Sequence, residues 1–574
     1  VVGVEANLRI TEFMSGNRSG LMDVDQEVED WIELHNPTSE TINLQGWSLT
    51  DDATDLNKWR FPDIILKSGK YLIIYASGKD RRSPESQLHT NFRLSTRGEY
   101  LALVQPDGVT IEQEHSPAYP VQYQDISYGV SPEGVQGYFH EPSPGSKNGD
   151  VVLGFLKKAE VSPGRGFYDE PFELKITSDV EGVVIRYTTN GNEPTAGYGK
   201  VYTKPLSIKK TSYFRVGVFK EGYQSPRVEA HTMIFVKDVK NQSFMNKKVT
   251  RHEVYEGLME KSLLAVPTLS LVLPSKSFFR GEKAIYEHAN KRGREWERAV
   301  SMEYMDPKSG EKFQVDGGIR IHGNAARGMP KKPLRLYFRD EYGAEKLEYP
   351  ILHKTDISSF DKLILRPCTH DSWQMAHEKA SVSENYGASY IRDEFARRMH
   401  KDMGRLSPMG RFVHVYVDGR YWGLYNLHER ADAFFMSDHL GGRTEDWDFV
   451  CGPENGPGIQ LVDGTLEAWN RMMKLADSGM KTAEKYEALQ EYINIDEFVD
   501  YMFAAIWLDH GDWLAIAGNN LSDGNKNWRA GRNRSGGGFQ FFLWDVESSM
   551  GKHGSLKDLN RAHNLIPEGC PCGG

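Results

Sequence analysis

Short runs of alternating apolar and polar residues dominate the first 148 residues of the chain. They include "LRITEF", "DWIELHN", "INLQGWSLTD", "KYLIIYAS" and "EYLALVQPDG". Gly, Asn, Asp and Pro separate these runs, as they separate neighbouring strands of all-β domains. The spacing predicts a β-sandwich over residues 7–148, with Trp31, Leu34 and Trp47 in its core.

A second group of alternating runs lies between residues 155 and 236. It contains "FELKITS", "VVIRYTTNGNEPT" and "KPLSIKKTSYFRVGVFKEGY". The pair Asn190-Gly191 is a strong hairpin signal, because both residues tolerate a positive φ. We therefore predict a second, smaller all-β sandwich. The turn-rich segment "EPSPGSKNG" reads as the linker between the two.

From about residue 262 strand patterns are mixed with helical ones. Strands are expected in "TLSLVL", "GGIRIHG", "PLRLYF", "KLILRP" and "FVHVYVDG". Helices are expected in "YIRDEFARRMHKDMG", "EAWNRMMKLADSG" and "IDEFVDYMFAAIWLDH", the first of them ending at Gly404. Strands that come first and helices that come later predict an α+β unit with two lobes over residues 262–574.

Length and charge narrow the class of protein. A chain of 574 residues is too long for one core. Its net charge of −10 argues against a general nucleic-acid binder, and no apolar run approaches the length of a membrane span. Four cysteines are too few for a disulfide framework. Because the chain starts without Met and stops on "CPCGG", we expect a removed secretory signal or a fragment of a longer protein.

One predicted strand finishes on an acidic pair. In "FQFFLWDVESSMG", residues 539–551, an apolar run leads directly to Asp545 and Glu547. Asp at a strand end can simply bond its own backbone in a turn. The alternative is a metal site, since a rigid strand end positions carboxylates well for Mg²⁺.

Further acid and amide residues precede this strand. Asp509 and Asp512 lie in "WLDHGDW", and Asn519 and Asn520 follow in "GNN". Phosphoryl transfer needs a carboxylate beside the acceptor hydroxyl, then an amide and a carboxylate that hold Mg²⁺ on the phosphates. The order Asp512, Asn519 or Asn520, Asp545 agrees with that scheme, although the spacing is looser than in ordinary protein kinases.

Basic residues stand on the predicted strands of the same region. "GGIRIHGNAARGMPKKPLRLYF" has a Gly-rich turn, with Lys331, Lys332 and Arg335 at the start of the second strand. Such a hairpin can approach phosphates closely, or it can be a solvated basic surface.

Two strand ends nearby carry further charged residues. Arg366 ends the buried strand "KLILRP" and needs an acidic partner, for which Asp393 and Glu394 are candidates. Glu429 ends the second arm of the hairpin "VYVDGRYWGLYNLHER", which we expect to lead into a hinge beside a nucleotide.

Three stretches of the chain resemble known families. Residues 7–148 resemble the lamin-tail domain, an immunoglobulin-like sandwich, through "LRITEFMSGN", "WIELHN", "GWSLTD" and "PSPGSKN". Residues 155–236 are similar to the small sandwich of chitobiase and hexosaminidase enzymes through "SPGRGFYDEPFELKI" and "IRYTTNGNEPT". The first resemblance implies a binding or spacer role, and the second implies a spacer or a contact with cell-surface glycan.

Residues 262–574 resemble the CotH-type spore-coat kinases, an atypical branch of the protein-kinase-like fold. The matching stretches include "GIRIHGNAARGMPKKPLRLYFRDEYG", "GRFVHVYVDGRYWGLYNLHERAD", "HGDWLAIAGNN" and "FFLWDVESSMG". The resemblance implies a secreted or cell-surface bacterial protein with ATP and Mg²⁺ (or Mn²⁺) as cofactors. Family members usually continue beyond "CPCGG", so we expect a truncated C-terminal lobe.

The resemblance also implies roles for acidic and amide residues. Asp512 becomes the catalytic acid, and Asn520, or else Asn519, the amide near the metal. Asp545 takes the place of the metal-binding Asp in the kinase Asp-Phe-Gly motif. Glu547 stands where family members often have a second Asp, so coordination by this residue needs a different geometry.

The implied cofactor contacts are basic. Lys331 or Lys332 faces the phosphates, with Arg320 nearby on the preceding strand, while Arg366 and Glu429 complete the expected nucleotide surroundings. The stretch "LSDGNKNWRAGRNRSGGG" is a long insertion before the metal-binding strand and is expected to be a flexible lid or disordered.

Two functions follow as hypotheses. The first is an exported kinase that transfers the ATP γ-phosphate to Ser or Thr of surface or coat proteins, without a nucleic-acid partner. The second is a non-catalytic surface scaffold or adhesion protein with a pseudokinase domain.

Overall fold

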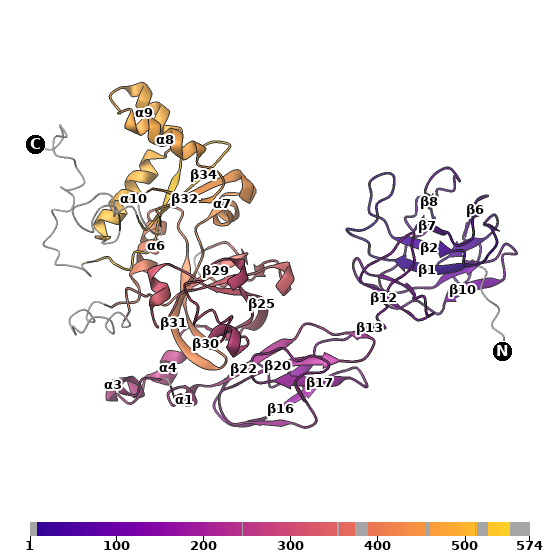
Figure 1. Ribbon diagram of the computed structural model, residues 1–574, viewed down its shortest axis with the longest axis horizontal. Helices are drawn as coiled ribbons and strands as arrows, with labels where there is room; N and C mark the ends of the chain where they lie inside the picture. Colours follow the sequence, from indigo (N-terminus) through magenta and orange to yellow (C-terminus); the bar gives the residue numbers. More distant parts are fainter. Residues whose placement is uncertain are drawn as a thin grey trace, which may run out of the picture.

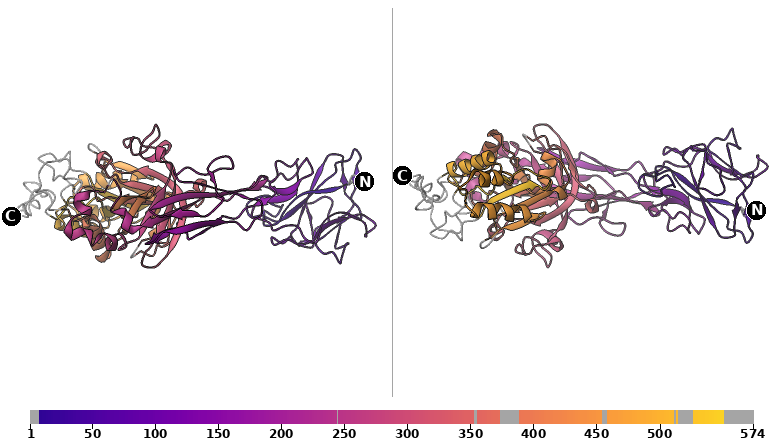
Figure 2. Two further views of the ribbon diagram at one scale, coloured as in Figure 1. Left: turned by 90° about the horizontal axis from the view of Figure 1, so that it is seen from below. Right: turned by 90° about the horizontal axis from the view of Figure 1, so that it is seen from above.

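The computed structural model describes residues 8–243, 245–352, 355–372, 388–453, 458–510, 513 and 526–550. Figure 1 shows three folded regions in chain order, two of them β-sandwiches and the third of mixed α/β content. The two further views show that the regions form an elongated molecule with the first sandwich at one end (Figure 2). No helix within these described ranges is both long and apolar enough to cross a bilayer.

The first sandwich packs two sheets around one apolar core. Its larger sheet contains, in spatial order, β12 (Gln136–Phe139), β11 (Ser127–Val130), β1 (Arg9–Met14), β2 (Trp31–His35), β7 (Tyr71–Tyr75) and β8 (Leu88–His89). The strands of both sheets are antiparallel except that β8 pairs with β7 in parallel. The smaller sheet contains β10 (Ile111–His115), β9 (Leu101–Val104), β4 (Ser48–Thr50) and β5 (Trp59–Arg60), and β3 (Ile42–Asn43) pairs with β6 (Ile65–Leu66). Trp31, Leu34 and Trp47 are buried, as predicted.

The predicted linker belongs to the first sandwich. Ser143 donates its backbone N–H and its hydroxyl to the buried carboxylate of Glu12, and the N–H of Gly145 donates to Glu33. Asn148 donates its side-chain amide to the carbonyl oxygens of Thr11 and Val130 at 2.9 Å each. Residues 143–148 are therefore pinned across the larger sheet instead of spanning free space.

The second sandwich is smaller. One of its sheets contains β14 (Glu160–Ser162), β16 (Phe172–Thr177) and β19 (Leu206–Ile208). The other contains β15 (Gly166–Tyr168), β22 (Glu229–Phe235), β20 (Ser212–Phe219), β17 (Val184–Thr188) and β18 (Lys200–Val201). β13 (Gly154–Phe155) pairs with β21 (Tyr223–Gln224) of this region, while the Phe155 ring packs on Tyr138 of the first sandwich.

The second sandwich is docked on the third region through buried polar groups. Glu303 has no exposed surface, and it accepts hydrogen bonds from Arg165 at 3.0 Å and from the N–H of Thr232 at 3.0 Å, both in the second sandwich. The predicted Asn190-Gly191 turn also lies in this contact. A Cβ on Gly191 would come within 2.0 Å of the carbonyl oxygen of Leu273, so only glycine permits the approach.

The third region begins with short helices and a closed barrel. The helices are α1 (Val236–Val239), α2 (Lys247–Thr250), α3 (Glu253–Glu256), α4 (Met259–Leu263) and α5 (Ser275–Phe278). The barrel closes in the order β23 (Thr268–Val272), β24 (Arg298–Met305), β25 (Lys312–Ile321), β26 (Leu334–Tyr337), β29 (Lys362–Arg366), β31 (Arg420–His428) and β30 (Gly410–Val417). A separate hairpin pairs β27 (Leu347–Glu348) with β28 (Ser359–Phe360).

The rest of the third region is a four-stranded sheet with helices. The sheet contains, in order, β33 (Gln460–Asp463), β32 (Trp447–Cys451), β34 (Trp528–Asn533) and β35 (Gln540–Leu543). The helices are α6 (Arg392–Asp402), α7 (Ala433–Leu440), α8 (Glu467–Asp477), α9 (Ala483–Gln490) and α10 (Ile495–Trp507). The helices expected around α6, α8 and α10 are confirmed. α10 starts where the Asn494 side chain caps the N–H of Glu497.

The insertion expected to be a lid contains a strand. Residues 528–533 form β34 in the middle of the sheet, so the prediction of a flexible loop is wrong there. Its glycine and arginines have packing roles: Gly531 lies where a Cβ would meet Phe449 at 2.8 Å, and Arg529 stacks on the Trp544 ring. The glycine- and arginine-rich composition of this segment is therefore the reason why sequence analysis did not predict a buried strand here.

Candidate functional site

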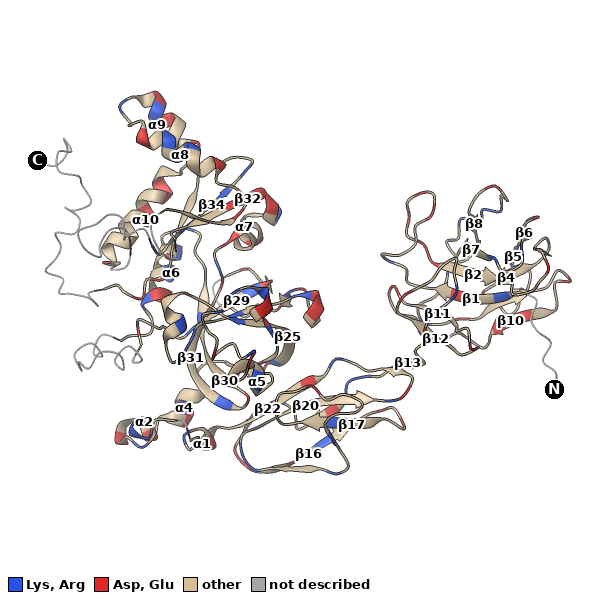
Figure 3. Ribbon diagram, viewed as in Figure 1, with Lys and Arg blue, Asp and Glu red and all other residues tan. Residues whose placement is uncertain are grey.

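A cavity lies where the barrel meets the four-stranded sheet. Acidic and basic residues are spread over all three regions of the molecule (Figure 3), but here they converge. The lining includes the Gly-rich turn Gly323, Asn324, Ala325 and Ala326, the cations Arg335, Arg366, Arg430 and Arg529, and the ring of His370 with Asp545 and Glu547. The Gly-rich turn and the acidic strand end therefore line one cavity, although they lie far apart in the sequence.

The acidic strand end is positioned by its buried neighbours. Phe542 and Leu543 of β35 have no exposed surface, and the backbone then turns at Asp545, whose φ is +57°. The N–H of Val546 donates to the carboxylate of Asp393 on α6 at 3.0 Å. These constraints direct the Asp545 carboxylate toward the cavity, where 29% of the side chain is exposed.

Arg366 joins the carboxylates at the end of β29. Its guanidinium contacts Asp545 directly, lies 2.9 Å from Glu547 and 3.7 Å from Asp393. The expected pairing with α6 is therefore confirmed for Asp393. Glu394 instead binds Arg397 at 2.9 Å and Arg398 at 2.6 Å.

The pKa values of the two carboxylates at the strand end are shifted in opposite directions. Burial opposes ionisation of Asp545, but the charge of Arg366 outweighs it and lowers the pKa of Asp545 below its ordinary value. Burial dominates at Glu547 and raises its pKa despite the same guanidinium. Arg366 itself has a raised pKa, because the three carboxylates favour its charged form over the cost of burial.

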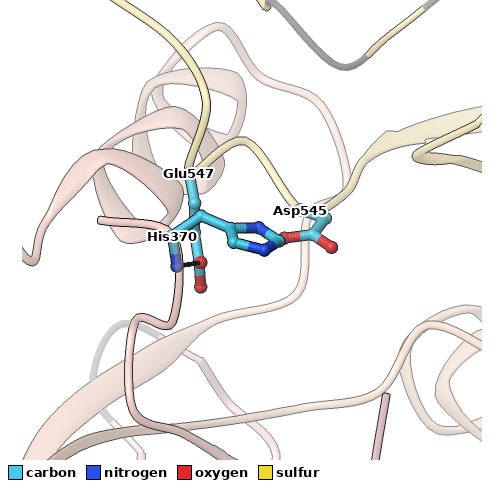
Figure 4. Close-up of side chains that lie close together, drawn as sticks. All are labelled: His370, Asp545 and Glu547. Atoms are coloured by element: carbon cyan, nitrogen blue, oxygen red, sulfur yellow. Dashed lines mark hydrogen bonds between the residues drawn. The ribbon is translucent and has the colours of Figure 1, made fainter. Parts of the chain in front are cut away.

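The same residues fit a divalent cation. His370, Asp545 and Glu547 each offer one ligand atom, and these atoms lie within 4.8 Å of one another (Figure 4). Glu547 is oriented by the N–H of His370, which donates to its Oε2 at 2.6 Å. Carboxylate oxygens suit Mg²⁺, and a nearby imidazole also suits Mn²⁺.

A basic wall faces the carboxylates. Arg335 of β26 lies 2.5 Å from His322 Nδ1 and donates to the Tyr337 hydroxyl at 3.1 Å. Burial and the neighbouring Arg430 lower the pKa of Arg335 to about 9. The pKa of His322 is far below its ordinary value, because the ring is buried among cations, so it accepts a hydrogen bond as neutral imidazole.

The two candidate lysines do not line this cavity. Lys332 is buried and donates its Nζ protons to the carbonyl oxygens of Arg327 and Met329, at 2.7 and 2.8 Å, so its charge stabilises the Gly-rich turn. Lys331 is packed beside Gly423, where a Cβ would come within 2.5 Å of its Nζ atom. Arg335 occupies the position in the cavity that was expected of these lysines.

Arg320 and Glu429 also point elsewhere. Arg320 donates to Glu297 at 2.7 Å and stacks on the Tyr337 ring, and it lines a neighbouring cavity. Glu429 is buried and accepts from the N–H of Met409 and from His439, both at 2.7 Å. The adjacent Arg430 lines the cavity instead.

The remaining candidates lie at or beyond the edge of the described chain. Asp512, Asn519 and Asn520 lie outside the described residues. Asp509 follows α10 with a φ of +50° and is absent from the described cavity lining.

Sequence reasoning missed three residues of the site. His370 follows Arg366 by four positions and is carried into the cavity by the chain that leaves β29. Arg430 follows the strand that bears Glu429, and Arg529 lay within the supposed lid. The only sequence signal for the first two was their position just after a buried strand, which is a weak indication by itself.

Comparison with family models gives three matches in the order expected. The model described as Lamin Tail Domain matches residues 3–116, and that described as Chitobiase/beta-hexosaminidase C-terminal domain matches residues 163–230. The model described as CotH kinase protein matches residues 319–568, which contain the whole carboxylate cluster. A comparison with curated proteins gave no match.

Proposed function

Because the chain carries a lamin tail domain, a chitobiase-type domain and a CotH kinase protein region, we propose that it is an exported bacterial protein kinase. In this proposal the barrel and the helical sheet region act as two lobes of a kinase-like fold. The region transfers the γ-phosphoryl group of ATP to a Ser or Thr hydroxyl of a surface or coat protein. The two sandwiches serve as spacers or as contacts with surface glycan.

One observation carries the proposal. A Gly-rich turn, the positive charge of Arg335, and the carboxylates of Asp545 and Glu547 line a single cavity, although more than 200 residues separate them in sequence. Phosphoryl transfer depends chiefly on positioning and on charge stabilisation, which such a cavity supplies.

Each residue then has a role. Asp545 and Glu547, with His370, would hold Mg²⁺ or Mn²⁺, which when bound neutralises phosphate charge. Arg335 and Arg430 would bind phosphate oxygens, and Arg366 keeps Asp545 ionised. The acceptor oxygen forms a bond to the γ-phosphorus as the bond to the β-phosphate oxygen breaks and ADP leaves. Asp512 would take the hydroxyl proton and orient the acceptor, and the amide of Asn520, or else of Asn519, would lie near the metal.

A second candidate function has its own observation. Arg366 contacts both Asp545 and Glu547 and supplies positive charge where a divalent ion would sit. A non-catalytic scaffold with a pseudokinase domain would need no further cation. The two candidates differ in whether a metal ion and ATP bind at these carboxylates.

Labelled phosphate transfer from ATP distinguishes them. With Mg²⁺ or Mn²⁺ we expect transfer by the wild-type protein and at least a hundredfold loss in Asp545→Asn, as expected when a charge-stabilising group is removed from such a site. Asp477→Asn, an exposed aspartate at the end of α8, is the matched control and should keep full activity. Asp512→Ala tests the proton acceptor. Equal transfer by wild type and Asp545→Asn would exclude the kinase assignment, and an ATP-induced thermal shift checks binding independently.

A further inference from the structure

A second cavity adjoins the carboxylate cavity and differs from it in charge. The two share the side chains of Arg335 and Arg430. The second is also lined by Lys291, Arg292, Arg320 and Arg327, so six of its twelve described lining residues are Lys or Arg. No Asp or Glu occurs among those twelve residues. A concave surface of this composition concentrates positive potential.

Several of these cations are bound to acceptors within the protein. Arg327 donates to backbone carbonyl oxygens, among them that of Ile321 at 2.8 Å, and so fixes the Gly-rich turn. Arg320 is paired with Glu297, and Arg430 lies 3.3 Å from Asp432. These contacts explain why a crowded set of cations is tolerated at the rim of the barrel.

Arg335 differs from these cations in its contacts. Its contacts are with a neutral imidazole and a phenol hydroxyl, and no salt bridge joins it to a carboxylate of the described chain. Its Nε atom is buried and has no hydrogen-bond partner among the described residues. Burial and the charge of Arg430 lower its pKa to about 9, because together they outweigh the stabilising effects of Tyr337 and Asp432 on its charged form. An incoming dianion would supply the missing charge and acceptors.

We propose that this second cavity is an oxyanion site that binds a phosphate dianion, either free inorganic phosphate or the phosphoryl group of a phosphorylated side chain. Arg335 would donate from inside, and Lys291, which is exposed at the rim, would contribute charge. The free-phosphate source stands independently of the proposed function. The phosphorylated-residue source rests on the proposed function. A kinase with this site would favour an acceptor protein that already carries a phosphate beside the next hydroxyl to be phosphorylated.

Calorimetric titration of the full chain, without nucleotide or metal, tests the site. The probes are inorganic phosphate, a peptide with one phosphoserine, and its unphosphorylated counterpart. We expect Lys291→Glu to weaken phosphate or phosphopeptide binding about tenfold, because reversing one charge at the rim turns attraction into repulsion. Lys276→Glu changes the net charge equally on exposed α5 and should leave the affinity within twofold.

The outcomes separate cleanly. Tighter binding of the phosphopeptide than of free phosphate identifies the acceptor as the source, while the reverse identifies a small-anion site, and both support the proposal. Equal affinity in Lys291→Glu and wild type, or no binding of either phosphate probe, would overturn it. A tungstate soak locates the anion directly: an anomalous signal between Arg335 and Lys291 places it in the second cavity, whereas a signal only between Arg335 and Asp545 would place it in the carboxylate cavity and overturn the proposal. None of these readouts requires ATP, so failure of the kinase assay and failure of this site are distinguishable.

Discussion

Two pairs of buried carboxylates, at opposite ends of the molecule, have contrasting surroundings. Glu12 and Glu33 face each other across β1 and β2 in the first sandwich and have no exposed surface. Hydroxyl and backbone N–H groups bind them, and no salt bridge reaches either one within the described residues. Asp545 and Glu547 instead share one guanidinium, that of Arg366.

The difference in partners produces a difference in charge. Burial raises the pKa of Glu12, and raises that of Glu33 to about 7. At the other end, Arg366 lowers the pKa of Asp545. A buried acid that is kept neutral can stabilise the fold through hydrogen bonds. One that is kept ionised and open to a cavity can attract a cation or a phosphate-bound metal. Burial of carboxylates alone therefore does not identify a functional site.

Removing the guanidinium of Arg366 should have the largest effect on the difference between the two carboxylate pairs. Arg366→Met would leave Asp545, Glu547 and Asp393 together without their cation, so we expect the free energy of unfolding to fall by about 3–5 kcal/mol. Denaturant unfolding of the full chain, followed by tryptophan fluorescence, measures it.

Arg398→Met is the control for that measurement. Arg398 binds Glu394 but is 36% exposed, and such pairs are worth at most about 1 kcal/mol. If Arg366→Met is as stable as Arg398→Met, Arg366 does not stabilise the fold by pairing with the three carboxylates.

Measuring the stability of the first sandwich over a pH series tests the pair Glu12 and Glu33. Since the folded-state pKa of Glu33 is about 7 and the unfolded value lies near 4.5, the folded first sandwich binds the extra proton between these pH values. The contribution of Glu33 to its stability is therefore fully present below pH 4.5 and is lost as pH rises to 7, by an amount on the order of 2–3 kcal/mol. Hydrogen exchange of β1 and β2 amides, corrected for intrinsic rates, follows the change.

Glu33→Gln should flatten that pH profile, because the amide has no proton to lose. Glu12 remains as a smaller contribution of the same sign. A profile in Glu33→Gln as steep as that of the wild type would show that another group is responsible.

The smallest expected effect concerns the hydrogen bonds of the neutral pair. Ser143→Ala removes a hydroxyl that donates to Glu12 at 3.0 Å but leaves the backbone N–H bond in place. We expect a loss of about 1 kcal/mol in unfolding free energy. Ser146→Ala, which alters an exposed hydroxyl of the same segment, should cost less; the reverse order would mean that Glu12 does not hold this segment.

Local sequence patterns predicted most elements of the fold because buried strands and amphipathic helices have a clear period. They also predicted the convergence of Arg366 with Asp393, since a buried Arg requires an acid. They did not predict which cation would face the carboxylates. Lys332 and Arg335 stand three positions apart beside the same turn, and only tertiary packing decides that Lys332 binds carbonyl oxygens while Arg335 enters the cavity. β34 was missed for a similar reason, as its Arg and Gly residues pack against specific neighbours.

The buried contact at Glu303 bears on how such a protein can be assembled from modules. A chain that began at residue 262 would expose this carboxylate and lose Arg165 and Thr232 as its partners. The second sandwich therefore completes the hydrogen bonding of a buried group of the barrel, and we expect the two to be most stable when they are kept together.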